Sequence, residues 1–522
     1  MNLHWLDIGT LSAYLVGMLT MGIYFSRKNT STEEYFVGGR SFTGWIVGLS
    51  LVGTSISSIT FIAFPADAFK TAWLRFLPNL MLPVGIVVAS HIFLPFFRRG
   101  KITSAYQYLE GRFGPSIRIY GAVAFIITQL LRVSIVLYLL SLVLHEMVGL
   151  SPTMCILVAG IFVALYTVLG GIDAVIWTDV IQTIVLVLGS VLCLGIIIHL
   201  LPGGLGQIFS VAIAENKFAL AELTDGKLNP VPWGFSLEHK TVMMMFLLGL
   251  TVFLSEYGTN QNTVQRYCAS KNIHEARKAM WVCVCTSLPI WAFYMFLGTS
   301  LFVFFKVFPI AETTEMLTGV RKAEQVLPFF IINYLPPGIT GLVIAAALAA
   351  AMSSLDSCIN AISTVGIVDI YRRHLVKGRD DRHYLKVAWI FASVAAVIMM
   401  GGAILLASSD TKTLQDTATI LSSLFGGGLL GMYMLGFLTN KGDARAVGFG
   451  IGGTVLFTCW TILSSKQLLP EALRVPFDLY YTIIIGNVVM FVIGFLAGTL
   501  LPEKKRDLTN LTVWKQDGTP LE

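Results

Sequence analysis

A short polar cluster interrupts one of the longest apolar stretches of the sequence. It consists of Ser353, Ser354, Asp356 and Ser357. If this segment is helical, Asp356 and Ser357 share a face with Ser353, at positions i+3 and i+4. Hydroxyl and carboxylate oxygens on one face are hard ligands, which suit a small cation such as sodium. The cluster is also compatible with a proton relay through Asp356, or with a plain hydrogen bond between packed helices.

A second polar run lies between residues 50 and 60 of another apolar segment. Its hydroxyl residues are Ser50, Thr54, Ser55, Ser57, Ser58 and Thr60. A helix with this composition is a poor lipid-facing helix and a good place for unwinding. An unwound turn offers free carbonyl groups to a cation and free N–H groups to an anion. The alternative is that these small side chains pack a tight helix interface.

Charged side chains within apolar segments are the third kind of candidate. Arg132 lies too far from either end of its segment to reach water easily. A buried guanidinium needs an anion, and its fork fits a carboxylate. The partner is either an internal acid, namely Asp179, Glu256 or Asp356, or the carboxylate of a substrate. Asp179 begins the first turn of its own segment, where a carboxylate can also be a simple helix cap.

The composition identifies the elements that position these residues. The chain is 55% hydrophobic and only 13% charged, with a mean hydropathy of +0.75, whereas soluble domains carry roughly a quarter charged residues. These values exclude a soluble enzyme, give no sign of nucleic-acid binding, and predict an all-α polytopic membrane protein in a lipid bilayer. Apolar stretches predict about 13 transmembrane helices, at 6–26, 43–69, 74–97, 117–148, 151–170, 174–200, 239–258, 276–306, 338–366, 385–407, 416–438, 446–465 and 477–500.

The predicted seventh helix ends in a polar stretch at residues 255–260 that contains Gly258. It lies five helices after the first polar break, so the two broken helices cross the membrane in opposite directions. This is the pattern of an inverted repeat of five plus five helices, with a site between the breaks. The repeats would span 43–200 and 239–438, after a first span at 6–26 and before two spans at 446–500 and a tail at 501–522. The alternative for the seventh helix is an ordinary frayed end.

The distribution of Lys and Arg predicts the orientation. With the N-terminus outside, most of the 36 basic residues fall in loops on one side, including Arg266 in the loop after the seventh helix. The positive-inside rule makes that side cytoplasmic. The outer loops 201–238 and 307–337 are the longest, and we expect short surface helices or a lid there.

Several motifs together resemble one known family. They are Tyr166-Thr167-Val168-Leu169-Gly170-Gly171, Trp177-Thr178-Asp179-Val180-Ile181-Gln182, Val264-Gln265-Arg266 and Ala349-Ala350-Ala351-Met352-Ser353-Ser354. With the thirteen expected spans, they resemble the sodium/solute symporter family with the LeuT-type fold over nearly the whole chain. The stretch from Ser57 to Phe69, with the lone Arg132, looks most like the bacterial sodium-coupled sialic acid symporters.

The resemblance implies site residues. For the substrate, it implicates Ser55, Ser57, Thr60, Asn79 and Arg132, with Arg132 pairing with the carboxylate of a sugar acid. For the first sodium ion, it implicates the carbonyl groups of Gly53, Ile56 and Ala350 and the hydroxyl groups of Ser353 and Ser354. For a second sodium ion, it implicates Asp179, Ser353, Asp356 and Ser357. One or two Na+ ions are therefore expected.

Three residues depart from the pattern of the sialic acid branch. Asp356 stands where that branch has serine, so the second ion site gains a charge and binds either sodium or a proton. Arg75 replaces an aromatic residue near the outer mouth, and Glu256 lies on the broken seventh helix, where the relatives are neutral.

The resemblance implies a single transporter domain over residues 1–522, working as a sodium-coupled symporter. Its substrate would be a small anionic solute, a carboxylated sugar such as a sialic acid, taken up by alternating access across a bacterial inner membrane. A neutral sugar or a short carboxylate is the alternative. The histidines lie mainly in loops or at span ends, which disfavours a membrane-embedded enzyme, and a channel or sensor would share the fold. The sequence gives no sign of an obligate protein partner.

Overall fold

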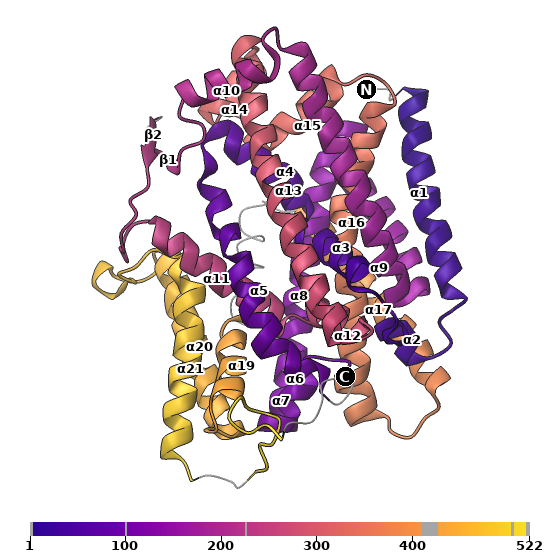
Figure 1. Cartoon of the computed structure of the whole chain (residues 1–522), viewed down its shortest axis with the longest axis vertical. Helices are drawn as coiled ribbons and strands as arrows, with labels where there is room; N and C mark the ends of the chain where they lie inside the picture. Colours follow the sequence, from indigo (N-terminus) through magenta and orange to yellow (C-terminus); the bar gives the residue numbers. More distant parts are fainter. Residues whose placement is uncertain (1–3, 100–101, 225–226, 409–425, 503–505, 518–522) are drawn as a thin grey trace.

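The chain is almost entirely helical (Figure 1). The computed structural model describes residues 4–99, 102–224, 227–408, 426–502 and 506–517. Among these residues, ten helices are long and apolar enough to cross a membrane, or eleven if the bent pair α3 and α4 counts as one. The predicted all-α membrane fold is confirmed, but the count of thirteen is not.

The described residues before 215 form thirteen helical segments. They are α1 (Trp5–Ser26), α2 (Thr32–Val37), η1 (Gly38–Arg40), α3 (Gly44–Ser55), α4 (Ser58–Lys70), η2 (Trp73–Met81), α5 (Leu82–Val88), η3 (Ala89–Phe93), α6 (Leu94–Arg98), α7 (Tyr106–Phe113), α8 (Pro115–Val148), α9 (Pro152–Leu200) and α10 (Gly204–Ala214). Here η1 and η2 are 3-10 helices and η3 is a π-helix.

The rest of the chain adds one small hairpin and further helices. These elements are β1 (Ala221–Thr224), β2 (Lys227–Pro230), α11 (Val242–Thr259), α12 (Gln261–Ala269), α13 (Ile273–Val307), α14 (Ala311–Thr318), η4 (Ala323–Gln325), α15 (Val326–Tyr334), α16 (Ile339–Val365), η5 (Gly366–Leu375), α17 (Asp381–Ser408), α19 (Leu429–Leu438), α20 (Ala444–Ser465), η6 (Glu471–Leu473) and α21 (Tyr481–Leu500). The strands β1 and β2 pair antiparallel.

Two places account for the difference from thirteen spans. Residues 152–200 form one helical stretch, α9, interrupted at Gly171, where two spans were predicted. Gly171 has φ 58°, and a Cβ there would lie 2.7 Å from the Tyr35 ring, so this kink favours glycine. The predicted span 416–438 lies outside the described residues up to 425, and α19 begins at Leu429. The five-plus-five division therefore stays a prediction.

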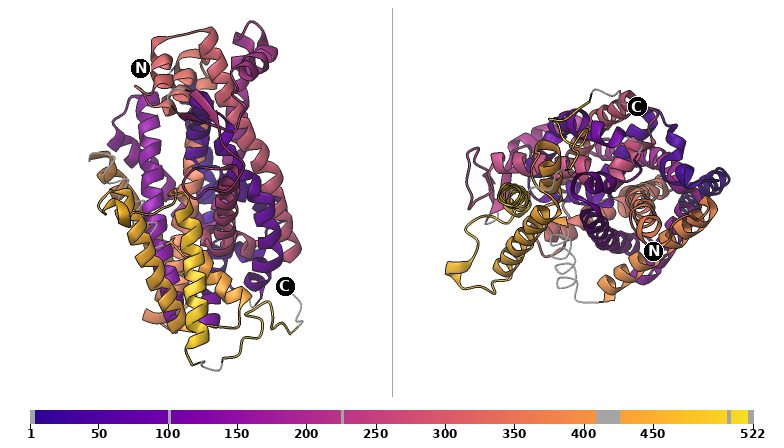
Figure 2. Two further views of the ribbon diagram at one scale, coloured as in Figure 1. Left: turned by 90° about the vertical axis from the view of Figure 1, so that its left-hand side faces the viewer. Right: turned by 90° about the horizontal axis from the view of Figure 1, so that it is seen from below.

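Helix α16 forms the centre of the bundle. Every residue from 343 to 367 is buried, and α16 packs most extensively against α9, with further contacts to α8, α1 and α17. A helix that is buried all round must place its polar side chains against other helices. By contrast, α20 and α21 pack mainly against each other at the edge of the bundle (Figure 2).

The two ends of the bundle carry different short elements. The segments predicted as long outer loops form α10, the β1–β2 hairpin, α14 and α15, at the end of the long axis where α1 begins (Figure 1). The opposite end carries α6, α7 and residues 507–517. Hydrogen bonds that fix this tail segment include those from Tyr108 to the Leu511 carbonyl (2.8 Å), from the Val513 amide to the Phe437 carbonyl (2.9 Å) and from the Trp514 indole to the Leu438 carbonyl (2.6 Å).

Candidate functional site

The predicted break in the second span is present. Helix α3 ends at Ser55, Ile56 and Ser57 are extended, and α4 then continues at a bend of 55°. The hydroxyl groups of Thr54 and Ser55 donate to the carbonyls of Ser50 and Leu51, four residues earlier (3.0 and 2.8 Å). Such bonds compete with the helix ladder and favour bending. Because the last carbonyls of a helix have no partner within it, the end of α3 exposes oxygen atoms inside the protein.

The seventh span is also broken, at Asn260 between α11 and α12. Ser255 and Thr259 donate to carbonyls four residues earlier (2.8 Å each), as in α3. The side chain of Glu256 connects the two halves: it accepts hydrogen bonds from Asn260 (2.8 Å) and from Thr263 on α12 (2.6 Å). The sequence left the role of Glu256 open, and the structure makes it a link across the break.

The first predicted cation site brings α3 and α16 together. Ser353 donates to the carbonyl of Gly53 at 2.6 Å, across 300 residues of chain. The neighbouring Ser354 hydroxyl is buried and has no hydrogen-bond partner among the described residues. Ala350 is buried on the same helix, and Ile56 lies at the break with an extended backbone. Carbonyl and hydroxyl oxygens are the ligand types that a hard monovalent cation accepts.

The second predicted cation site contains a cation of the protein itself. The Arg266 guanidinium lies 2.7 Å from the carboxylate of Asp179 and donates to the Ser357 hydroxyl at 2.6 Å. It also donates to the Ser50 hydroxyl (2.8 Å), which in turn donates to Asp179 (2.6 Å). All these side chains are buried, so a positive charge already neutralises Asp179.

Asp356, the fourth residue of that set, faces α9 rather than the guanidinium. It accepts a hydrogen bond from the Tyr166 hydroxyl (2.7 Å), and Thr178 lies at 3.4 Å. Ser357 donates to the carbonyl of Ser353 at 2.6 Å, with Asp356 at 3.3 Å. Two carboxylates, Asp179 and Asp356, therefore lie in one buried polar cluster with one arginine.

The prediction that Arg266 lies in a cytoplasmic loop is wrong. Arg266 belongs to α12, in which every residue from Gln261 to Ala269 is buried. A polar helix that faces only protein has the composition of a loop, so hydropathy misplaced it. Its motif was noted in the sequence, but a role as the partner of Asp179 was not foreseen.

The predicted substrate residues lie in two places. Arg132 is exposed to a cavity of about 620 Å³ with Gln129 of the same helix and residues of α11, α20 and α21. Among the described residues it has no ion pair, and its three candidate internal partners, Asp179, Glu256 and Asp356, have the other partners given above. The structure therefore does not support an internal acid for Arg132.

The other predicted substrate residues do not line that cavity. Ser55 and Ser57 are half-buried at the break, and Thr60 is buried on α4. Asn79, in η2, has a buried side-chain nitrogen without a hydrogen-bond partner among the described residues. The structure does not bring these four residues into one pocket with Arg132, and their shared role stays a prediction.

The C-terminal end of α4 has two charged neighbours. Arg75 forms an ion pair with Asp67 at 2.5 Å, which gives this residue a structural partner. Lys217, from the segment after α10, is 3% exposed and donates to the carbonyls of Phe69 (2.7 Å) and Thr71 (2.9 Å) at the end of α4. Burial lowers the pKa of Lys217 to about 7, against the opposing effect of Glu215. The sequence analysis did not single out Lys217.

A helical membrane protein with two broken helices beside a central polar cluster has the architecture of a secondary transporter. The sodium:solute symporter family matches residues 35–445, and the chain belongs to this family. It is 31% identical over 510 residues to the sodium/sialic acid symporter SiaT of Proteus mirabilis, covering 97% of this chain and 98% of that protein. It is 29% identical to the sodium/sialic acid symporter NanT of Aliivibrio fischeri, covering 94% and 92%.

A solved structure is also similar to this one. It is the substrate-bound, outward-open state of a Na+-coupled sialic acid symporter, which matches with a TM-score of 0.86 and 29% identity, covering 97% of this chain and all of that chain.

Proposed function

We propose that this protein is a sodium-coupled symporter that imports a sialic acid, or a closely similar acidic sugar, by alternating access. The observation that carries the proposal is the contact between the open end of α3 and the α16 hydroxyls, through Ser353 and Gly53 (2.6 Å). The similarity to two sodium/sialic acid symporters over nearly the whole chain supports the substrate class. Family membership favours transport over enzymatic catalysis.

Sodium would bind between α3 and α16. Its ligands would be the carbonyl groups of Gly53, Ile56 and Ala350 and the hydroxyl groups of Ser353 and Ser354. An ion there would replace the hydrogen bond from Ser353 to Gly53, and the Ser353 proton would turn to another acceptor. Because the ion would connect the broken helix to the central helix, it would favour the state in which the break is ordered for substrate. Such coupling needs a differential affinity of only about 1–3 kcal/mol.

The substrate carboxylate would bind at Arg132. This proposal is supported by a guanidinium that lines a cavity and has no carboxylate partner among the described residues. A bidentate bond between arginine and a carboxylate is strong and directional. The hydroxyls of Ser55, Ser57 and Thr60 and the amide of Asn79 would bind polar groups of the sugar, after a movement that brings the break and the cavity together.

The protein would lie in a bacterial inner membrane with its N-terminus outside. The end of the bundle with α6 and α7 holds Arg98, Arg112 and Arg118, and the positive-inside rule places such an end in the cytoplasm. Under an inside-negative potential, each sodium ion that enters contributes about 2.3 kcal/mol per 100 mV.

Sodium coupling is tested by uptake of radiolabelled sialic acid into proteoliposomes that contain the purified full chain. An inward sodium gradient should drive accumulation above the external concentration, and choline in place of sodium should abolish it. Uptake that continues unchanged in choline would refute the proposal. Accumulation of a neutral sugar, but not of sialic acid, would favour the alternative substrate.

The carboxylate assignment is tested with Arg132→Ala and Arg132→Lys. Loss of a charge-assisted bond should raise the half-saturating sialic acid concentration about 10- to 100-fold in Arg132→Ala, with a smaller effect in Arg132→Lys. Arg382→Ala, at an exposed position outside the cavity, is the matched control and should transport normally. Unchanged affinity in Arg132→Ala would show that the carboxylate binds elsewhere.

A further inference from the structure

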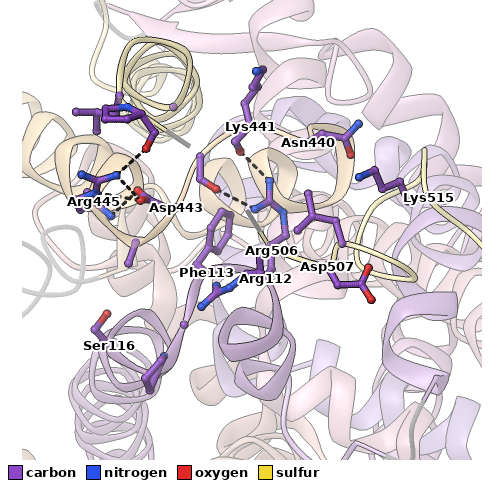
Figure 3. A pocket seen from close by; sticks show the side chains of 18 residues that line it. Arg112, Phe113, Ser116, Asn440, Lys441, Asp443, Arg445, Arg506, Asp507 and Lys515 are labelled. Atoms are coloured by element: carbon purple, nitrogen blue, oxygen red, sulfur yellow. Dashed lines mark hydrogen bonds and ion pairs between the residues drawn. The ribbon is translucent and has the colours of Figure 1, made fainter. Parts of the chain in front are cut away.

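A large cavity opens at the end of the bundle that carries α7, and none of its lining residues belongs to the proposed transport site. Its volume is about 1070 Å³. The wall is formed by the junction of α7 and α8, the connection between α19 and α20, the end of α21 and the tail segment (Figure 3). Four parts of the chain therefore meet around one space.

The lining of this cavity is strongly basic. Its charged residues are Arg112, Lys441, Arg445, Arg506, Lys515, Asp443 and Asp507. Asp443 is already paired with Arg445 (2.9 Å) and caps α20 through the amides of Arg445 and Ala446. The described lining thus has a clear excess of positive charge, which attracts an anion.

Arg112 contributes a buried charge without a carboxylate partner among the described residues. Its guanidinium donates instead to the carbonyls of Thr439 (3.0 Å), Lys441 (2.7 Å) and Gly442 (3.0 Å). These bonds satisfy its donors but leave its charge in place. Burial lowers the pKa of Arg112; Tyr108 opposes the shift, and Arg506 lowers the pKa further. Arg506 is therefore close enough for like-charge repulsion, which an anion between them would relieve.

Two further cations of the lining, Arg506 and Lys515, are available to a ligand. The side chains of Arg506 and Lys515 are exposed, and neither has a hydrogen bond or ion pair with the described residues. Hydrogen bonds from Thr509 lower the pKa of Asp507, and the charge of Lys515 lowers it further. The effect of Lys515 is consistent with positive surroundings in this part of the cavity. The first turn of α8 adds backbone amides, because α8 has no side-chain cap and Ser116 lines the cavity.

The position of the cavity identifies the source of the anion. Leu501 and Pro502, at the end of α21, lie on the wall together with Phe113 and Pro115. The α21 side chains that lead to this end, Leu496 and Leu500, are exposed, as expected for a lipid-facing helix. A basic pocket at the end of such a helix lies at the depth of phospholipid headgroups, and basic pockets of this kind bind anionic lipids.

We propose that this cavity binds the phosphate group of an anionic phospholipid of the cytoplasmic leaflet. Arg506 and Lys515 contact the phosphate, the amides of the first turn of α8 complete its coordination, and Arg112 supplies a fixed positive field behind them. The acyl chains lie along the exposed face of α21. A bound lipid thereby joins the tail segment to α8 and to the connection between α19 and α20.

The test measures lipid binding to the purified full chain by native mass spectrometry, with thermal stability as the second readout. Phosphatidylglycerol should bind saturably and stabilise the protein, and phosphatidylcholine should do neither. Arg506→Ala/Lys515→Ala should weaken phosphatidylglycerol binding about 30-fold, since each basic residue near the surface contributes about 1 kcal/mol. Arg506→Lys/Lys515→Arg keeps both charges. Its affinity for phosphatidylglycerol should remain within about threefold of that of the original protein, because attraction between exposed charges depends only partly on the exact side-chain geometry.

The matched control is Arg382→Ala/Lys386→Ala, which removes two exposed charges at the start of α17, outside the cavity. It should bind phosphatidylglycerol like the original protein. Equal binding by all four proteins would overturn the proposed site. A third arm adds inorganic phosphate: stabilisation by millimolar phosphate that depends on Arg506 and Lys515, without any from the lipid, would assign the site to a free phosphate and overturn the lipid assignment.

Discussion

The two predicted cation sites share Ser353 and the central helix α16, yet they differ in whether a positively charged side chain of the protein lies within them. The first site, at Gly53 and Ser354, has oxygen ligands, and in the described part of the chain no Lys or Arg side chain forms a hydrogen bond with them. In the second site, Arg266 donates to one oxygen of Asp179 and to the Ser357 hydroxyl, and the other oxygen of Asp179 has no hydrogen-bond partner among the described residues. Oxygen atoms that already bind a charged side chain of the protein are less available to a metal ion.

The end of α4 follows the same rule as the second site. Its carbonyls receive the ammonium group of Lys217, whereas the end of α3 receives uncharged donors: the Gly53 carbonyl accepts from the Ser353 hydroxyl and the Val52 carbonyl from the Ile56 amide. The two halves of one broken span thus end in opposite ways. We therefore expect sodium binding to depend on the end of α3. We expect the protein's own cations, Arg266 and Lys217, to affect the free energy of unfolding instead.

The largest effect is expected at Arg266. Arg266→Ala should lower the free energy of unfolding by about 3–5 kcal/mol, because it leaves the Asp179 carboxylate buried without a partner. Thermal or chemical unfolding of the purified protein measures this change. Arg266→Ala/Asp179→Asn removes both charges and should recover much of the loss. If the double variant is as unstable as the single one, the ion pair is not the cause.

The next largest effect is expected at the first site. Ser353→Ala and Ser354→Ala should each raise the sodium concentration for half-maximal uptake about tenfold, since each removes one ligand worth about 1.4 kcal/mol. Sodium titration of uptake in proteoliposomes gives this value. Ser363→Ala is the matched control, because Ser363 lies on the same helix and donates to Ala388 instead. An unchanged sodium titration in both variants would show that these hydroxyls do not bind the ion.

Lys217 should produce a smaller effect, one that depends on pH. Its folded-state pKa of about 7 lies below the ordinary lysine value, so between these values the unfolded chain binds more protons and stability rises with pH. From pH 7 to 8 this group alone should add about 1 kcal/mol to the free energy of unfolding; at pH values well below 7 it adds no slope. Glu215 and Lys306, the charged neighbours, form an ion pair with each other.

The pH effect is measured as the difference in stability between the original protein and Lys217→Met. This difference should change with pH above 7 in favour of the original protein. Lys240→Met serves as the comparison: burial alone would lower the pKa of Lys240, but the hydrogen bond and charge of Glu222 help to raise it. This variant should therefore show no such rise between pH 7 and 8. A difference for Lys217→Met that does not vary with pH would show that this lysine does not titrate near neutrality.

The smallest effect is expected at Asp356. Asp356→Asn keeps an acceptor for the Tyr166 hydroxyl, and it should shift the half-maximal sodium concentration less than threefold if only the first site binds sodium. The measurement is again the sodium titration of uptake. A shift above tenfold, or a loss of steepness in the titration, would show that a second ion binds at Asp356 despite Arg266.

The sequence was most informative where the chain faces lipid. Apolar runs located α1, α8, α13 and α17, because lipid imposes an unbroken apolar composition on a spanning helix. The break in α3–α4 was also predictable, since clustered hydroxyls compete with the helix backbone. It was least informative in the interior: α12 has the polar composition of a loop but packs only against protein, and its pairing with α9 depends on tertiary contacts that no local pattern encodes.

In the candidate site, too, some contacts were predicted from the sequence and others were not. The contact between Gly53 and Ser353 agrees with the ligand set that the family resemblance implied. The ion pair between Arg266 and Asp179 was not predicted, because the sequence placed Arg266 in a cytoplasmic loop. The separation of Arg132 from the hydroxyls of the break also could not be read from the sequence. It depends on how α8 sits against α20 and α21, and thus on the packing of whole helices.

The tail segment at residues 507–517 has a consequence for biosynthesis. Its amide and indole groups satisfy the carbonyls of Phe437 and Leu438 at the end of α19, yet the ribosome translates it only after α20 and α21. The carbonyls of Phe437 and Leu438 therefore lack these donors while α20 and α21 are translated and inserted, although Arg112 and Thr439 already satisfy the carbonyls of Gly436 and Leu435. A stop codon just before residue 507 would yield a chain that keeps α19, α20 and α21 but never supplies the two missing donors.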